Sequence, residues 1–291
     1  MTSRHPQIAV IMRSYNDAAV IDQTLHSVMN QAFTDFQLWN FDSSSTDGTQ
    51  GIIHRYNLPE HIHLNDSAQY NPGRVLNSAV AASDSDILVF LNSDASPTSP
   101  QWLQRLIAPL ADPSVGASFG RQIPRPDCRS LFVKDTERAF GDGSIAAQWP
   151  HFYSMANAAV RRDVATKYPF ETRIQYSEDI EWSYRMRCDG LRIAYVEDAP
   201  AMHSHNYTLS QSYRRQHGEG MADAWIFRDD EIDPSFLRYC LLPLGMEVLR
   251  DLRWSIQQRS LDGLAHAIPL RVAQKWGRWQ GLRQGQLHDE K

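Results

Sequence analysis

Residues 86–94, DILVFLNSD, show the pattern that decides the fold: an apolar run that stops abruptly at polar residues. A continuous apolar run of this kind is typical of a strand that is buried on both faces of a parallel sheet. Residues 7–12, QIAVIM, form a similar run, and RSYND follows at residues 13–17. Because open parallel sheets bind ligands outside the carboxyl ends of their strands, we expect these polar residues to lie at a binding face.

Strands and amphipathic helices alternate over the first two thirds of the chain. Strands are predicted at residues 7–12, 36–41, 61–64, 86–91, 115–119 and 191–196. Helices are predicted at residues 20–29, 49–56, 72–80, 99–110 and 177–188. This alternation predicts an α/β sandwich with a mainly parallel central sheet. Residues 121–150, broken by prolines and glycines, are expected to form a loop-rich insertion near the active face, and the chain beyond His205 is expected to be mostly helical.

The bulk composition excludes several classes of protein. The 291 residues are 42% hydrophobic and 22% charged, enough for a full core, and the net charge of −5 argues against a general nucleic-acid binder. Cys128, Cys188 and Cys240 lie far apart, so we expect no disulfide framework or zinc knuckle and favour a reducing cytoplasm. No apolar run approaches the roughly 20 residues that a membrane helix needs, so neither a signal peptide nor a transmembrane helix is expected.

The last part of the chain is basic. Residues 246–285 contain seven Lys and Arg residues against three acidic ones, a local charge of 7 − 3 = +4, with Trp254, Trp276 and Trp279 among them. A basic, aromatic helical tail can lie against anionic lipid headgroups, where each basic residue contributes about 1 kcal/mol. A solvated helical cap on the core explains the same residues equally well. We therefore expect a cytoplasmic protein, with peripheral contact to the inner face of the cytoplasmic membrane as an open alternative.

Three polar clusters follow apolar strands: RSYND at 13–17, DSSSTDGT at 42–49 and NSD at 92–94. Ordinary polar turns have similar compositions, because Asp, Ser and Gly form local hydrogen bonds in turns. In this order and at these spacings, however, the clusters resemble the nucleotide-binding half of family 2 glycosyltransferases of the GT-A type, and the resemblance covers about residues 7–215.

This resemblance implies a domain organisation and a reaction. A glycosyltransferase domain is expected at residues 1–205, with a donor half at about 7–120 and an acceptor half at about 121–205. Residues 206–291 are expected to be a helical C-terminal extension. The implied reaction moves a sugar from a nucleotide-diphosphate donor to an acceptor hydroxyl, with inversion at the anomeric carbon.

The donor-binding residues are expected within these clusters and in NPGR at residues 71–74. The resemblance implies that Asp42 accepts a hydrogen bond from a pyrimidine N3–H, and that the backbone around Arg13 and Tyr15 closes over the base. Gly73 would permit close approach, and Arg74 would touch phosphate, although a simple helix start explains these residues almost as well. The other donor-binding candidates are Asp47, Asn77, Asn92 and Ser93.

A divalent cation is implied by Asn92-Ser93-Asp94, which matches the D-x-D pattern of the family in part. Mg²⁺ or Mn²⁺ takes oxygen ligands from one or two carboxylates together with phosphate and water. Asp94 is therefore expected to bind the metal, and Asn92 to donate to ribose or sugar. In related enzymes a histidine after the catalytic helix completes the metal shell; His203 is the first candidate and His205 the second.

The catalytic groups are expected in SEDIEW at residues 177–182, which resembles the E-D motif of the family. Asp179 is the predicted general base for the acceptor hydroxyl, and Glu178 is expected to orient donor or acceptor. A helix N-terminus stabilises carboxylate anions, although acidic residues are also simply common there. Trp182 is expected to share the face of these residues and to stack on a sugar.

The choice of substrate is the least determined feature. HSHNY at residues 203–207 and YRR at 213–215 resemble bacterial rhamnosyltransferase-like members, which use dTDP-rhamnose and build cell-surface polysaccharide such as O-antigen. Donors are therefore expected to be dTDP- or UDP-sugars, and the acceptor a glycan or a lipid-linked glycan. A sugar-phosphate nucleotidylyltransferase would need a glycine-rich phosphate loop, which residues 13–20 lack. The one feature that favours a non-catalytic nucleotide-sugar-binding protein is Asn92, which stands where the D-x-D pattern has its first aspartate.

Overall fold

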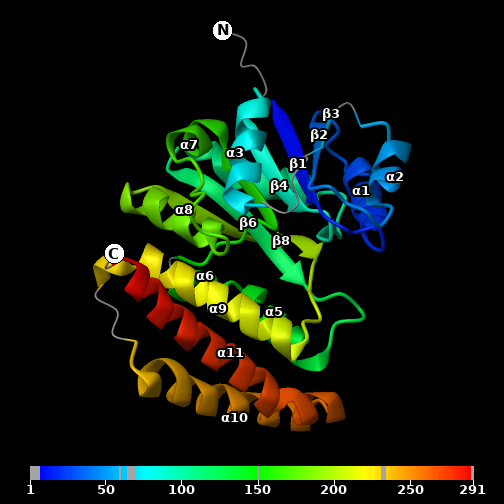
Figure 1. Cartoon of the computed structure of the whole chain (residues 1–291). Coiled ribbons are helices and arrows are strands. Elements are labelled where there is room, and N and C mark those ends of the chain that lie inside the picture. Colours follow the sequence, from blue (N-terminus) through cyan, green and yellow to red (C-terminus); the bar gives the residue numbers. More distant parts are fainter. Residues whose placement is uncertain (1–6, 59, 64–69, 150, 231–233, 290–291) are drawn as a thin grey trace. The chain divides into compact units, whose positions relative to one another are not determined.

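The computed structural model describes residues 7–58, 60–63, 70–149, 151–230 and 234–289, which form two compact units (Figure 1). The first unit consists of Met1–Arg125, Glu137–Thr172 and Glu178–His203, and the second of Pro126–Thr136, Arg173–Ser177 and Ser204–Lys291. The second unit thus takes in Pro126–Thr136, Arg173–Ser177 and residues 204–205, which the sequence predicted to belong to the first domain.

An eight-stranded mixed sheet, in the order β3-β2-β1-β4-β7-β6-β8-β5, runs through the first unit. Its strands are β1 Ile8–Ser14, β2 Gln37–Asp42, β3 Glu60–His63, β4 Ile87–Asn92, β5 Ser96–Pro97, β6 Val115–Ile123, β7 Asn157–Arg161 and β8 Arg192–Met202. The adjacent strands β3, β2, β1 and β4 are all parallel, and β6 is parallel to β8. β7 is antiparallel to both β4 and β6, and β5 is antiparallel to β8.

The predicted α/β class with its parallel strands is confirmed, while β5 and β7 were missed. The predicted end of the third strand, Leu64, lies outside the described residues. β7 was missed because its sequence, NAAVR, contains small residues that give no strong strand pattern. It nevertheless occupies the centre of the sheet, between β4 and β6.

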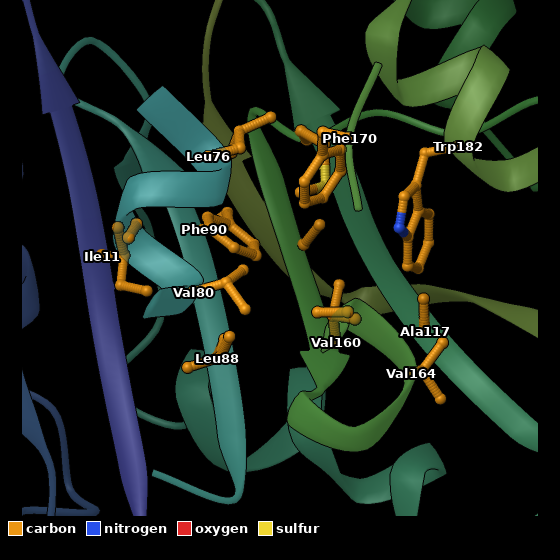
Figure 2. Close-up of a cluster of buried hydrophobic side chains, with 14 of the residues drawn as sticks. Ile11, Leu76, Val80, Leu88, Phe90, Ala117, Val160, Val164, Phe170 and Trp182 are labelled. Carbon is orange, nitrogen blue, oxygen red and sulfur yellow. The ribbon is translucent and has the colours of Figure 1, made fainter. Parts of the chain in front are cut away.

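Helices cover both faces of the sheet because alternate residues of each strand point to opposite sides. Ala9 and Ile11 of β1 belong to a core that includes residues of α3, α7 and α8, part of which Figure 2 shows. Ile8, Val10 and Met12 belong to a second core, with residues of α1, α2 and α4. These helices are α1 Ile21–Met29, α2 Thr49–Arg55, α3 Pro72–Ala82, α4 Trp102–Ile107, α7 Arg162–Lys167 and α8 Glu178–Cys188, and a 3-10 helix at Ala108–Ala111 follows α4.

The expected loop-rich insertion at residues 121–150 is wrong in its main feature. The segment contains the end of β6 and two helices, α5 Ser130–Phe140 and α6 Ser144–Gln148. The glycines fall between the helices: Gly143, at φ +77°, directly precedes α6. These residues therefore mark the helix boundaries and do not indicate a continuous loop.

The second unit is helical, as expected. Its helices are α9 Leu209–Ile226, α10 Leu242–Gln257 and α11 Leu261–Asp289, with a 3-10 turn at Arg228–Asp230 and a π turn at Leu237–Leu241. α11 packs against both α9 and α10. A Cβ at Gly281 would lie 2.0 Å from the carbonyl oxygen of His217, so the absence of a side chain allows α9 and α11 to approach closely. Among the described residues, no helix combines the length and the apolar content needed to cross a bilayer.

Candidate active site

The carboxyl ends of β1, β2 and β4 bring the three polar clusters together. Ser14 of β1 pairs in register with Asp42 of β2, and Arg13 pairs with Asn92 of β4. The backbone N–H of Ser93 continues this edge by donating to the carbonyl oxygen of Arg13 at 3.0 Å. The three clusters therefore share one edge of the sheet.

Arg13 connects this edge to the beginning of α8. Its Nη2 donates to Oδ1 of Asn92 at 2.7 Å, and its Nη1 lies 3.7 Å from Oε1 of Glu178. The Arg13 and Glu178 side chains are only 11% and 14% exposed. The side-chain oxygen of Asn92 thus accepts from Arg13, a contact that the sequence did not predict. Because Asn92 carries no charge, it accepts a hydrogen bond from Arg13 without competing with Glu178 for the ion pair.

The Asp42 carboxylate forms hydrogen bonds within the protein. Its side chain is fully buried, and Oδ1 accepts hydrogen bonds from the Ser45 N–H at 2.9 Å and from Nε2 of Gln50 at 2.8 Å. Oδ2 accepts from the hydroxyls of Ser14 and Ser45 at 2.8 and 2.7 Å. Burial alone would raise the pKa of Asp42, but these hydrogen bonds outweigh it and lower the pKa. Because a carboxylate has about four acceptor sites, these four hydrogen bonds engage it and hold the loop; its predicted hydrogen bond from a base N–H stays a prediction.

Asp47 links the second loop to the first, and Asp17 links the first loop to the third. Asp47 accepts from the Thr49 hydroxyl at 2.6 Å and from the Ala18 N–H at 3.0 Å, so its carboxylate braces the loops; its predicted contact with the donor stays a prediction. Asp17, to which the sequence analysis gave no role, accepts from the Ser93 hydroxyl and from the Tyr15 N–H. Tyr15 itself is 52% exposed at this edge.

The pKa of Asp17 is raised from its ordinary value. Burial raises this pKa; the hydrogen bonds from Ser93 and Tyr15 oppose the increase, and the charges of Asp94 and Asp47 add to it. A cation at this edge would reduce the repulsion among the three carboxylates. The chemistry of the edge is therefore suited to a metal ion.

Asp94 and His203 form the best-defined candidate metal site of the first unit. His203 lies at the end of β8, and its Nε2 lies 3.5 Å from Oδ1 of Asp94. Its Nδ1 lies 2.7 Å from Oε1 of Gln122, an amide oxygen that only accepts, so Nδ1 is assigned as the donor. Gln122 is oriented in turn by a 2.9 Å hydrogen bond from its Nε2 to the Ser154 hydroxyl. In its neutral form His203 would therefore direct the Nε2 lone pair toward the Asp94 carboxylate, an arrangement that fits a divalent cation.

His205 belongs to the second unit, where its ring stacks on Tyr207 with a centroid distance of 5.1 Å. Its predicted role as a metal ligand stays a prediction.

Asp179 lies in the first turn of α8 and is partly buried. Its Oδ2 accepts from the Met155 N–H at 3.4 Å, and the next carbonyl, that of Ala156, accepts from the Asn92 N–H at 3.1 Å. Two consecutive residues thus link the beginning of α8 to the end of β4. Burial and the charge of Asp179 raise the pKa of Tyr153 well above its usual value, so Tyr153 stays protonated beside this carboxylate.

The expected sugar-stacking role of Trp182 is wrong. Trp182 is fully buried, and its Nε1 donates to the carbonyl oxygen of Tyr168 at 2.7 Å. Its ring stacks between Tyr153 and Phe170, at centroid distances of 5.7 and 5.4 Å, and Figure 2 shows it pointing into the core. Trp182 and Met186, one turn apart, form the face of α8 that packs on the sheet.

The side-chain amide of Asn77 also forms hydrogen bonds within the protein. Its Nδ2 donates to the Phe170 carbonyl at 2.8 Å, and its Oδ1 accepts from the Phe170 N–H at 2.8 Å. Both ends of the amide are used to hold α3, so its predicted contact with the donor is not supported. The close approach at Gly73 is to the chain's own backbone, since a Cβ there would lie 2.1 Å from the carbonyl oxygen of Glu171. Arg74 is exposed in the first turn of α3.

The sequence matches the model of the family described as "Glycosyl transferase family 2" over residues 9–169, more than half of the chain. The chain belongs to glycosyl transferase family 2.

Curated relatives of this family 2 glycosyltransferase include two bacterial enzymes. It is 31% identical over 241 residues to the O-antigen chain rhamnosyltransferase WbaN of Salmonella anatum, covering 77% of this chain and 75% of the relative. It is 28% identical over 237 residues to the O-antigen chain rhamnosyltransferase RfbN of Salmonella typhimurium, with 77% and 75% covered.

Solved structures share the fold of this family 2 glycosyltransferase. The mannosyltransferase PcManGT from Pyrobaculum calidifontis, in complex with GDP-Man and Mn²⁺, superposes with a TM-score of 0.68 at 18% identity, covering 99% of this chain and 89% of that one. Glucosyl-3-phosphoglycerate synthase from Mycobacterium tuberculosis, in complex with Mg²⁺ and UDP, gives a TM-score of 0.57 at 20% identity, with 78% and 81% covered.

Two residues of this family 2 glycosyltransferase site were missed from the sequence. Asp17 ends the first polar cluster, RSYND, so its position after a strand was the available signal. Gln122 offered no such signal, because it lies within a strand and acts through His203, which is 81 residues away in the chain.

Proposed function

We propose that this glycosyltransferase moves a sugar from a nucleotide-diphosphate donor to an acceptor hydroxyl with inversion, and that a divalent cation holds the diphosphate. The observation that carries this proposal is the placement of the Asp94 carboxylate opposite Nε2 of His203, at the same sheet edge as the beginning of α8. The opposing pair supplies a metal site, and α8 supplies the base.

Asp94 and His203 would hold Mg²⁺ or Mn²⁺. When bound, the ion would offset the negative charge of the donor diphosphate. Relatives of the same fold support this choice, since the solved structures include one with Mn²⁺ and GDP-Man and one with Mg²⁺ and UDP. His205 is retained as an alternative ligand.

Asp179 would act as the general base. The acceptor hydroxyl would transfer its proton to a carboxylate oxygen of Asp179 as its oxygen attacks the anomeric carbon. The bond from that carbon to the diphosphate oxygen would break, and the nucleoside diphosphate would leave with the electron pair of that bond. The hydrogen bond from Met155 and the position in the first turn of α8 both favour the ionised form. Glu178, paired with Arg13, would orient the donor or the acceptor.

The substrates follow from similarity. The two O-antigen chain rhamnosyltransferases favour rhamnose as the transferred sugar. The resemblance of the sequence to rhamnosyltransferase-like members favours dTDP-rhamnose as the donor, with a UDP-sugar as the alternative. They also favour a glycan or lipid-linked glycan acceptor and a place in cell-surface polysaccharide synthesis at the cytoplasmic side of the membrane.

Thermal stability in the presence of nucleotides tests the proposed function. The purified protein is heated with dTDP, UDP, GDP or CMP, each with and without Mn²⁺. A ligand that binds only the native state raises the apparent stability, by about 2.7 kcal/mol at a concentration of 100 Kd. We expect dTDP or UDP to stabilise the protein only when Mn²⁺ is present. Stabilisation by none of the nucleotides would favour a non-catalytic protein and contradict the proposal.

A further inference from the structure

The second unit has an unusual distribution of apolar side chains on α10. Leu242, Met246, Leu249 and Ile256 are all exposed, the last three at 52%, 70% and 66%. Their spacing of four, three and seven residues places them on one side of the helix. Such a stripe normally faces the core of a soluble protein.

The opposite side of α10 is polar and buried. Asp251 and Ser255 are fully buried, and Asp251 accepts hydrogen bonds from Lys134 and, at 2.7 Å, from Nε of Arg271. α10 is therefore partly inverted relative to an ordinary surface helix. Its inward face combines the buried polar side chains of Asp251 and Ser255 with Leu252, which packs against a small apolar core, while the exposed apolar stripe faces outward. Ile268 and Val272 of α11, exposed at 57% and 44%, add further apolar surface to this unit. A helix of this kind is suited to an apolar environment outside the protein.

The charges that remain outward are all positive. Within residues 237–260, Arg238, Arg250, Arg253 and Arg259 are exposed. Of the two acidic side chains of this segment, Asp251 pairs with Lys134, and Glu247 pairs with Arg250 at 2.8 Å. Within the described part of the chain, the unpaired outward charge therefore comes from Arg253, Arg238 and Arg259. Arginine side chains beside an apolar stripe keep their head groups in the polar layer while their stems cover apolar surface.

Several of the basic residues on which the sequence-based prediction of membrane contact rested are not exposed in the structure. Arg271 is buried and paired with Asp251 and Asp135, and Arg278 pairs with Asp223. Burial lowers the pKa of Lys275. These three basic residues are thus turned into the unit, whereas Arg253 and Arg259, in and after α10, are exposed.

From the partly inverted helix and its arginines we propose that the outer face of α10, defined by Leu242, Met246, Leu249, Arg253 and Ile256, docks onto an anionic lipid bilayer at the headgroup level. The apolar side chains enter the boundary between headgroups and acyl chains, and the arginines contact the phosphates. A second copy of the chain is a less suitable partner, because a two-fold interface would bring this arginine-bearing face against itself. The proposal rests on this face and is independent of the proposed reaction.

Vesicle sedimentation with the full chain tests this docking. The probes are vesicles of equimolar phosphatidylcholine and phosphatidylglycerol, and vesicles of phosphatidylcholine alone. We expect binding to the anionic vesicles, with weaker binding to the neutral ones. Met246→Glu should weaken binding by at least about tenfold, because it places a charge within the apolar layer. Met29→Glu is the matched control, since Met29 of α1 is exposed to a similar extent, 51%, and it should bind as the wild type does.

Other results would overturn the docking. Absence of wild-type binding to anionic vesicles, or equal weakening by Met246→Glu and Met29→Glu, would each do so. A dimer in light scattering that Leu249→Glu converts to a monomer, without any lipid binding, would assign the face to a second copy instead. Asp179→Asn should bind vesicles normally, so loss of catalysis and loss of docking are separable. The melting temperature of each variant shows whether it is folded.

Discussion

At the scale of single residues, the His203 imidazole is the group whose orientation matters most for the candidate metal site. The hydrogen bond from Nδ1 to Gln122 fixes both the tautomer and the ring direction, and so decides which nitrogen faces Asp94. Groups that orient a metal-bound histidine in this way usually contribute strongly to metal affinity although they never touch the ion.

Gln122→Met is therefore predicted to weaken Mn²⁺ binding by about 10- to 100-fold, because the side chain keeps its volume but loses the acceptor for Nδ1. Titration of free Mn²⁺ by electron paramagnetic resonance measures this affinity without turnover. Ser154→Ala is the matched control: it removes the other hydrogen bond of Gln122 and leaves the bond to His203 in place. Equal affinities for wild type and Gln122→Met would exclude His203 as an oriented ligand.

Asp179→Asn is predicted to lower the transfer rate by about 10²- to 10⁴-fold while donor binding stays largely intact, because only proton removal from the acceptor is lost. Calorimetry measures donor binding, and product formation measures transfer. Asp84→Asn, the same change at a side chain that is 98% exposed in the loop before β4, should leave both unchanged. If Asp179→Asn lost donor binding and transfer equally, the residue would be a binding group and not the base.

At the scale of elements, the polar residues at the beginning of α3 mainly hold that helix in place. Asn71 caps α3 by accepting from the Arg74 N–H at 2.9 Å, and its Nδ2 donates to the Thr172 carbonyl at 3.0 Å. Asn77 and Gly73 make further close contacts to residues 170 and 171. The sequence reveals the polar residue types, but the partners decide whether they bind a ligand or the backbone.

Gly73→Ala is predicted to destabilise the first unit by about 1–3 kcal/mol, because the new methyl group would meet a backbone carbonyl that has little freedom to move. Gly51→Ala in α2 is the control. Nothing lies within 4 Å of its Cβ position, so the better helix propensity should stabilise by about 0.5–1 kcal/mol. Urea denaturation measures both, and a neutral Gly73→Ala would contradict the close packing of α3.

At the scale of the whole molecule, the response to pH sums groups with opposite tendencies. Hydrogen bonds and the nearby charge of Arg161 lower the pKa of Asp163, although burial opposes them, so its contribution to stability is lost as the pH falls. Burial raises the pKa of Asp223, in α9, to about 6; Arg278 opposes this increase and Glu219 adds to it. Between about pH 4 and 6 the folded state therefore keeps a proton on Asp223 that the unfolded chain has lost, so this contribution falls as the pH rises.

We predict that the melting temperature of the wild type minus that of Asp223→Asn is largest near pH 4, decreases up to about pH 6 and is then constant. Asparagine cannot titrate, so the difference isolates the one carboxyl group. Calorimetry at a series of pH values measures it, and Asp163→Asn should give a slope of the opposite sign. A difference that does not change with pH would mean that Asp223 has an ordinary pKa in the folded protein.

The sequence by itself determined the parallel strands, most of the helices that join them and the edge of the sheet where the site lies, but not β5, β7, α5 or α6. Apolar runs such as residues 8–12 and 87–91, ending at polar clusters, predict parallel strands whose ends meet, because burial periodicity is a local property of the chain. Asp94, Glu178 and Asp179 were selected on this basis together with the family resemblance.

Only the tertiary structure decided what each polar side chain contacts. Arg13 meets Asn92 across 79 positions of the chain, and Gln122 meets His203 across 81, so the sheet register and the path of β8 set these pairs. Trp182 faces the core for the same reason: packing of α8 on the sheet determines which side of the helix is inward. The outward apolar face of α10 likewise became visible only once Asp251 was found buried among Lys134 and Arg271, because local periodicity identifies an amphipathic helix but not which of its faces is buried.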